Sequence, residues 1–95
     1  MPAYIIAEIQ VTDPTAYEGY RPLAAASIAR FGGRYVVRGG KLDLLEGEPV
    51  PGRIVVIKFL DADAARRWYR SEEYQKALRI RQSASRGRVF LVEGA

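Results

Sequence analysis

The chain has 95 residues, of which 27% are charged, and its formal net charge at pH 7 is +4. It contains no Cys and no His, which excludes disulfides, thiolate or Ser-His nucleophiles, ordinary zinc sites and histidine-ligated haem. No apolar run approaches the roughly 18 residues of a membrane span, and no basic-then-apolar leader opens the sequence, so we expect one cytoplasmic domain over residues 1–95.

The first third of the sequence predicts a strand followed by a helix. Residues 4–11 place apolar side chains at alternate positions, which is the period-two pattern of a strand. Asp13 supplies an N-cap for a helix over residues 14–31, whose apolar side chains recur at helical spacing. Pro22 removes a backbone donor, so we expect a kink or a fresh helix start beside it. Gly32 and the glycine after it end the helix.

The middle of the chain predicts two further strands and the segment between them. Residues 34–38 form the second strand of the predicted fold. Residues 39–52 are rich in Gly and Pro and predict turns or a short hairpin arm. Residues 54–60 are almost continuously apolar, which is typical of a central strand that is covered on both faces.

The last third predicts two helices and a closing strand. Asp61 caps a helix that carries Trp68, and Ser71 caps the next helix, which has two glutamates in its first turn. Residues 88–93 read as the final strand. A hard-metal site on Asp61 and Asp63 is the alternative, but a cap with a helix-dipole partner explains both carboxylates better, so we expect no metal.

The order strand, helix, strand, strand, helix, strand predicts an α+β fold of the ferredoxin-like type. Its four-stranded antiparallel sheet carries both helices on one face. The opposite face is also partly apolar, with Ile6 on the first strand and alternating aliphatic residues on the third. A second copy is the simplest cover for that face, so we expect a two-fold homodimer whose sheets pack face to face.

Short motifs with a characteristic order and spacing run along the chain. They are the Met1-Pro2-Ala3-Tyr4 start, Asp13-Pro14 with Tyr17 and Tyr20, Phe31-Gly32-Gly33-Arg34-Tyr35, Arg38-Gly39-Gly40, Trp68-Tyr69 with Ser71, Glu73 and Tyr74, and Arg81. Together they make the chain similar, over nearly its whole length, to the family of domain of unknown function 1330 (DUF1330), within the dimeric α/β-barrel superfamily. Glu72 departs from the proline that such sequences often carry before Glu73, and either residue suits a first helical turn.

The resemblance implies a homodimer but no established reaction. The superfamily includes cofactor-independent monooxygenases, muconolactone isomerases and haem enzymes, and the fold does not choose among them. The lack of His disfavours the haem branch, and we expect no cofactor. By analogy, a pocket between helices and sheet binds a small aromatic or carboxylate-bearing molecule. The enzyme hypothesis is a cofactor-independent oxygenase or isomerase, and the alternative is a non-catalytic small-molecule-binding or assembly module.

The resemblance suggests five ligand-binding candidates and assigns no catalytic residue. The candidates are Tyr17, Tyr20, Trp68, Tyr74 and Arg81. The aromatic residues also fall on faces that must be buried, so a place in the core is their default interpretation. Arg81 either binds a carboxylate or enolate bidentately or is a solvated helix residue.

Glu8 interrupts an apolar strand on the predicted dimer face. Because buried carboxylates are rarely unpaired, Lys58, Arg34 or Arg38 from neighbouring strands is expected to neutralise it. We favour this structural ion pair over a general base with a raised pKa.

Two further functions are weighed against the residues. The positive charge of the second half favours nucleic acid, but the third-strand positions that would carry stacking aromatics hold Val55 and Ile57, so we expect no nucleic-acid partner. Removal of Met1 would expose the secondary amine of Pro2, the base used by tautomerases. We keep this as a minor alternative, because Met-Pro openings are common without function.

Overall fold

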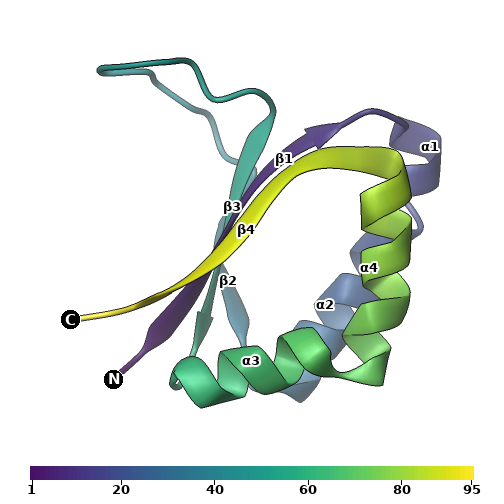
Figure 1. Cartoon of the computed structure of the whole chain (residues 1–95), viewed down its shortest axis with the longest axis vertical. Coiled ribbons are helices and arrows are strands. Elements are labelled where there is room, and N and C mark those ends of the chain that lie inside the picture. The colour runs from purple at the N-terminus through teal and green to yellow at the C-terminus, as the bar shows by residue number, and fades with distance from the viewer.

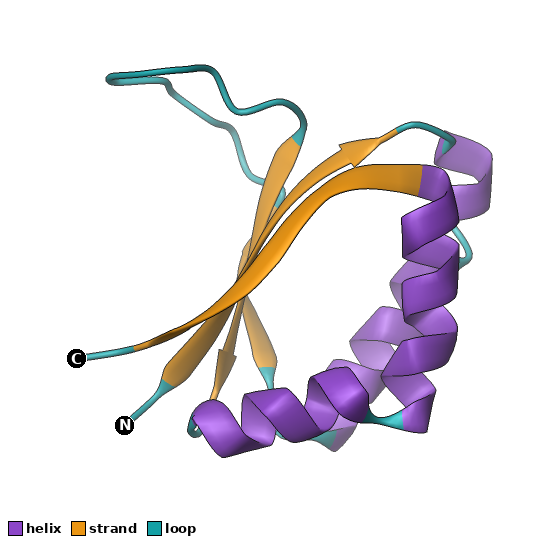
Figure 2. Ribbon diagram, viewed as in Figure 1, coloured by secondary structure: helices purple, strands orange, loops and turns teal.

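A computed structural model describes all 95 residues. The elements are β1 (Ala3–Val11), α1 (Pro14–Tyr17), α2 (Tyr20–Arg30), β2 (Arg34–Arg38), β3 (Arg53–Phe59), α3 (Ala62–Arg70), α4 (Glu72–Ala84) and β4 (Ser85–Glu93). The strands form one antiparallel sheet in the order β2-β3-β1-β4, and the helices all lie on one of its faces (Figures 1 and 2). This confirms the α+β, ferredoxin-like prediction, and the sheet of the single chain is open, not closed into a barrel. None of the helices combines the length and the apolar character needed to cross a membrane.

The predicted helix over residues 14–31 is two helices. Asp13 Oδ1 accepts a hydrogen bond from Ala16 N (3.2 Å) and caps α1, which ends at Tyr17. Helix α2 starts afresh at Tyr20, so Pro22 lies in its first turn, where the missing N–H needs no partner. Gly32 ends α2 with φ 77°, as expected of a left-handed cap.

Helices α3 and α4 begin at the predicted caps. Asp61 Oδ1 accepts from Ala64 N (2.8 Å), and Ser71 Oγ accepts from Tyr74 N (3.1 Å). Ser71 Oγ also donates to Trp68 O (2.7 Å), so this residue closes one helix and opens the next. The two helices therefore meet at a sharp corner (Figure 1).

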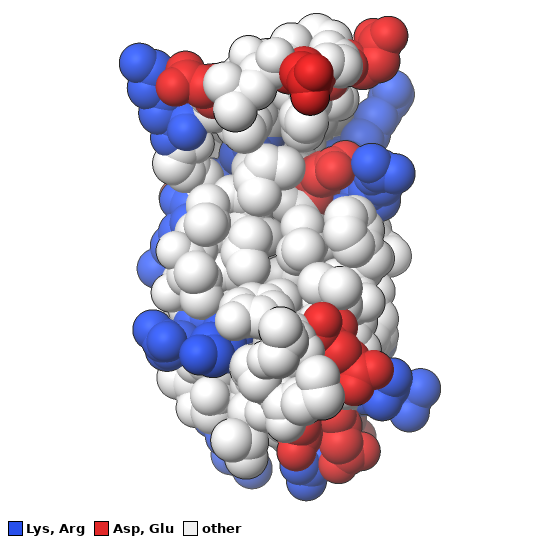
Figure 3. Space-filling model, turned by 90° about the vertical axis from the view of Figure 1, so that its left-hand side faces the viewer, with Lys and Arg blue, Asp and Glu red and all other residues white.

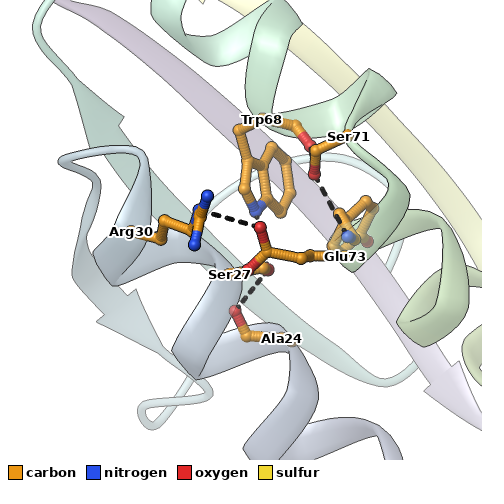
Figure 4. Close-up of polar contacts among 7 residues, drawn as sticks. Ala24, Ser27, Arg30, Trp68, Ser71 and Glu73 are labelled. Carbon is orange, nitrogen blue, oxygen red and sulfur yellow. Dashed lines mark hydrogen bonds and ion pairs between the residues drawn. The ribbon is translucent and has the colours of Figure 1, made fainter.

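A buried polar contact joins these helices to α2. Trp68 Nε1 donates to Ser27 Oγ (3.0 Å), and Ser27 Oγ donates to Ala24 O (2.8 Å). Both side chains are buried, and Trp68 packs against Phe59 of β3 at a ring-centroid distance of 5.4 Å. Beside them Arg30 Nε lies 2.8 Å from a carboxylate oxygen of Glu73 (Figure 4). This cluster fixes α2 against α3 and α4 above the sheet.

An irregularity in β2 corrects the predicted place of Arg38. Arg34 lies opposite Lys58, but the register shifts between Tyr35 and Val37, so that Arg38 lies opposite Val55. Strict alternation would have put Arg34 and Arg38 on the same face. The bulge moves Arg38 to the helix-facing side of the sheet and leaves Arg34 on the open side.

The closing strand starts three residues earlier than predicted, at Ser85, directly after α4. Gly87 therefore lies within β4, where it pairs with Ile9. A Cβ at Gly87 would clash with the carbonyl oxygen of Glu8, and its φ is 156°. Glycine at this position is what lets the strand follow β1 so closely.

The sheet face away from the helices is open and largely apolar. At its centre Ile6 pairs with Val56 on one side and Phe90 on the other, and Phe90 is 41% exposed. Charged side chains gather at the margins of this face (Figure 3). Val55 and Ile57, which were expected at exposed positions where stacking aromatics would lie, point to the helix side of the sheet, since they pair with the buried residues Ala7 and Ile5.

The segment between β2 and β3, which we call the arm (residues 39–52), contains no helix or strand. It leaves the sheet on the side opposite the helices (Figures 1 and 2). Leu42, Leu44 and Leu45 on the arm are 47%, 56% and 90% exposed. Of the two predicted alternatives for this segment, turns or a short hairpin, the hairpin is absent. The arm presents unburied apolar side chains beyond the open face.

Candidate functional site

A cavity lies between the helix-facing side of the sheet and the helices. Fifteen residues line it, and 11 of them are hydrophobic. They come from all four strands and all four helices, which places the cavity at the centre of the fold. Its free volume is about 40 Å³, which is room for a few water molecules. A larger ligand therefore requires lining side chains to move.

The five candidates from the sequence line this one cavity. Tyr17 comes from α1, Tyr20 from α2, Trp68 from α3, and both Tyr74 and Arg81 from α4. The indole N–H of Trp68 is already bonded to Ser27, so Trp68 offers the cavity only its ring. The polar groups that remain in contact with one another belong to α2 and α4.

The hydroxyl of Tyr74 is the centre of this polar group. It lies 2.9 Å from the Tyr20 hydroxyl, and Arg81 Nε donates to it at 3.3 Å. Burial raises the pKa of Tyr20 far above its ordinary value, and the neighbouring Tyr74 raises it further. Burial acts to lower the pKa of Arg81, but Tyr74, together with Tyr20 and Tyr69, more than offsets this effect and the pKa is raised overall. The guanidinium therefore stays charged, and the Tyr20 phenol stays neutral.

Arg81 is a buried cation and not the solvated helix residue that we considered as its alternative. It is 7% exposed, and no carboxylate forms an ion pair with it. Its side-chain partner is the hydroxyl of Tyr74 and not a carboxylate. A buried guanidinium without a carboxylate partner is costly, and it indicates a place where a bound anion would be stabilised.

Three more arginines line the cavity, and none of them was expected there from the sequence. Arg53 pairs with the buried Ile9, which turns it toward the helices, and its Nη2 donates to Arg38 O at 3.4 Å. The Arg38 guanidinium stacks 4.1 Å from the centroid of the Tyr35 ring. Arg21 follows Tyr20 on α2. β3 begins at Arg53, one residue before the predicted start, and strand alternation places Arg53 on the same face as Val55 and Ile57.

Glu8 lies on the other side of the sheet, away from the cavity. Its carboxylate accepts hydrogen bonds from Arg88 Nε (2.8 Å) and Nη2 (3.2 Å), not from Lys58, Arg34 or Arg38 as predicted. The reason is the register, which places Arg88 of β4 directly opposite Glu8. The hydrogen bond from Arg88 lowers the pKa of Glu8, which favours a structural ion pair over a general base.

Comparison with known sequences agrees with this fold. The model of the family described as a domain of unknown function, DUF1330, matches residues 2–95. No curated protein matches the chain.

Solved structures share the fold at low sequence identity. A protein of unknown function from Rhodopseudomonas palustris aligns with a TM-score of 0.79 at 18% identity, over 99% of this chain and 82% of the other. SnoaB, a cofactor-independent oxygenase from Streptomyces nogalater, aligns with a TM-score of 0.68 at 19% identity, over 99% of this chain and 93% of the other. A dimeric ferredoxin-like protein of unknown function from Jannaschia sp. CCS1 aligns with a TM-score of 0.73 at 11% identity, over 100% of this chain and 99% of the other. At these identities the similarity establishes the fold alone.

Proposed function

The chain belongs to the DUF1330 family, and from that premise we propose that it forms a homodimer in which each subunit binds a small aromatic or carboxylate-bearing molecule in its cavity. The observation that carries this proposal is the convergence of Tyr20, Tyr74 and Arg81 in a space lined mainly by apolar and aromatic side chains. The Trp68 and Tyr74 rings, 4.0 Å apart between centroids, form an aromatic wall beside these polar groups. A few polar atoms in an apolar pocket are what orient a small ligand.

The enzyme form of this function is a cofactor-independent oxygenase. SnoaB, which shares the fold, is described as such an enzyme, and this supports the reading by analogy. The chain itself offers a neutral phenol, a second phenol and a fixed cation where a ligand hydroxyl or enol would meet them. The same groups suit an isomerase that stabilises an enolate.

A non-catalytic binding module is the second candidate. It requires less rearrangement of the cavity, whose free volume of about 40 Å³ must already enlarge to admit an aromatic ligand and would have to enlarge further to admit molecular oxygen as well. Binding alone would need only the existing contacts and a modest movement of the lining.

The homodimer is supported by the open sheet face. Its apolar centre around Ile6 and Phe90 has no cover within the chain, and the structural relative from Jannaschia is described as dimeric. We propose that two sheets pack face to face and that the arm, which leaves the sheet on that side, packs against the second copy (Figure 1).

Ligand-observed NMR with a panel of hydroxylated aromatic compounds tests the binding function. Wild type is compared with Ala7→Leu, which adds atoms to a buried residue in the cavity wall. We expect some of these compounds to bind wild type and to bind Ala7→Leu at least about 10-fold more weakly, because the leucine side chain occupies the space of the ligand. Ala26→Leu, on the exposed side of α2, is the matched control and should leave binding unchanged.

Oxygen uptake separates the two candidates. The protein is incubated with each compound that binds, in air-saturated buffer without added metal or cofactor, and the concentration of dissolved oxygen is followed with an electrode. Uptake that falls at least about 10-fold in Tyr74→Phe supports the oxygenase. Binding without uptake or rearrangement of the compound supports the binding module, and no binding at all contradicts both.

A further inference from the structure

The walls of the cavity carry positive charge only. Four of the 15 lining residues are arginines, namely Arg21, Arg38, Arg53 and Arg81, and none is Asp or Glu. They come from four different elements, α2, β2, β3 and α4. No single strand or helix face explains their convergence, so the fold itself gathers these cations around one space.

These cations are left largely without protein counter-ions. No carboxylate pairs with Arg38, Arg53 or Arg81. Arg53 Nε is buried and has no hydrogen-bond partner. Arg21 Nε is 3.3 Å from a carboxylate oxygen of the exposed Glu18, but the contact lacks the geometry of a hydrogen bond. Buried donors without acceptors cost free energy, and an anion in the cavity would satisfy them.

We propose that the ligand of this cavity is an aromatic carboxylate, whose acid group is bound by the guanidinium groups and whose ring lies against the aromatic wall. This inference rests on the binding function proposed above and names its chemical class. Arginine presents planar, forked donors that match a carboxylate bidentately. The ring of the ligand meets Trp68 and Tyr74, and a hydroxyl on that ring would reach Tyr20.

The free volume fixes how such a ligand enters. About 40 Å³ admits a few waters but no aromatic ring, so lining side chains must swing aside. Arg38 is the exposed arginine of the lining, and it is held by its own Tyr35 ring and not by an ion pair. Of the four arginines it is therefore the one whose displacement breaks the fewest buried contacts.

The test compares benzoate with benzamide, which has nearly the same shape and no charge, by isothermal titration calorimetry. We expect wild type to bind benzoate at least about 10-fold more tightly than benzamide, with benzoate affinity falling as salt rises. Arg53→Gln should weaken benzoate at least about 10-fold and leave benzamide unchanged. Arg81→Gln should do the same, and Arg53→Gln keeps the test valid if loss of the buried Arg81 impairs folding. Arg79→Gln, exposed on α4, is the matched control and should change neither affinity.

The outcomes separate this inference from the binding function. Equal binding of benzoate and benzamide, with no effect of either cavity variant, overturns the carboxylate assignment and leaves an aromatic site. Displacement of benzoate by inorganic phosphate at equal concentration also overturns the carboxylate assignment, because the site would then bind anions in general without preference for a planar acid group. If neither compound binds wild type but a hydroxylated aromatic compound of the NMR panel does, the carboxylate assignment fails and the binding function stands. If no compound binds in either experiment, both fail.

Discussion

At the residue scale, the hydrogen bond between Trp68 and Ser27 combines packing with polar satisfaction. Ser27→Ala would leave the indole N–H without a partner at a site where Trp68 is 1% exposed. We expect the free energy of unfolding to fall by about 1–3 kcal/mol, the cost of a buried unsatisfied donor. Urea denaturation followed by fluorescence measures this directly, since Trp68 is the single tryptophan.

The control for Ser27 is another helical serine whose hydroxyl bonds within its own helix. Ser83 Oγ donates to Ile80 O at 3.0 Å in an exposed position. Ser83→Ala should change stability by less than about 0.5 kcal/mol, as surface substitutions usually do. Equal losses in the two variants would mean that the Trp68 contact contributes nothing specific.

At the scale of elements, helix starts were the most predictable features because their signals are local. Asp61 and Ser71 each accept a backbone hydrogen bond three residues ahead, and this spacing is visible in the sequence. The break before Tyr20 was only half predicted: Pro22 indicated it, but whether a helix kinks or restarts depends on how the segment packs.

Features that depend on pairing between strands could not be predicted in the same way. The bulge in β2 exists only in its register with β3, and it alone moves Arg38 from the open face to the cavity. The partner of Glu8 depends on the register between β1 and β4. Helical spacing therefore predicted the burial of the aromatic residues, and the family resemblance suggested that they line a pocket, whereas most of the arginines of the cavity were not predicted.

The pair that joins β1 to β4 predicts a pH dependence. Arg88 lowers the pKa of Glu8 below its ordinary value of 4.5, so the stability that Glu8 contributes is present above that value. It is lost as the pH falls through the lowered pKa. Glu8→Gln should therefore melt at a lower temperature than wild type at pH 7, and the difference should vanish as the pH falls well below 4.5.

Melting curves at fixed protein concentration between pH 7 and pH 3 measure this effect. Glu48→Gln on the arm removes an exposed carboxylate that has no ion pair, and it should track wild type throughout. A Glu8→Gln difference that stays constant down to pH 3 would contradict the role of the ion pair.

At the scale of the whole molecule, the sheet separates two surfaces of different composition. The helix-facing side encloses the cavity and its arginines, while the open side presents an apolar centre with charges at its margins (Figure 3). Because the two lie on opposite faces of the same strands, dimerisation can cover one without filling the other. A change on the open face should therefore alter assembly before it alters ligand binding.

Ile6→Asp tests this separation. Ile6 lies between Val56 and Phe90 at the centre of the open face, and in a two-fold dimer the substitution places two carboxylates in one apolar interface. We expect the dissociation constant of the dimer to rise at least about 100-fold, measured by analytical ultracentrifugation, because each charge loses its water without gaining a partner. Leu23→Asp, an equally drastic change at a 44% exposed position on α2, should leave the dimer intact because the helices face away from the interface. A wild-type protein that stays monomeric at micromolar concentration would contradict the face-to-face dimer, and the apolar centre of the sheet would then require a different partner.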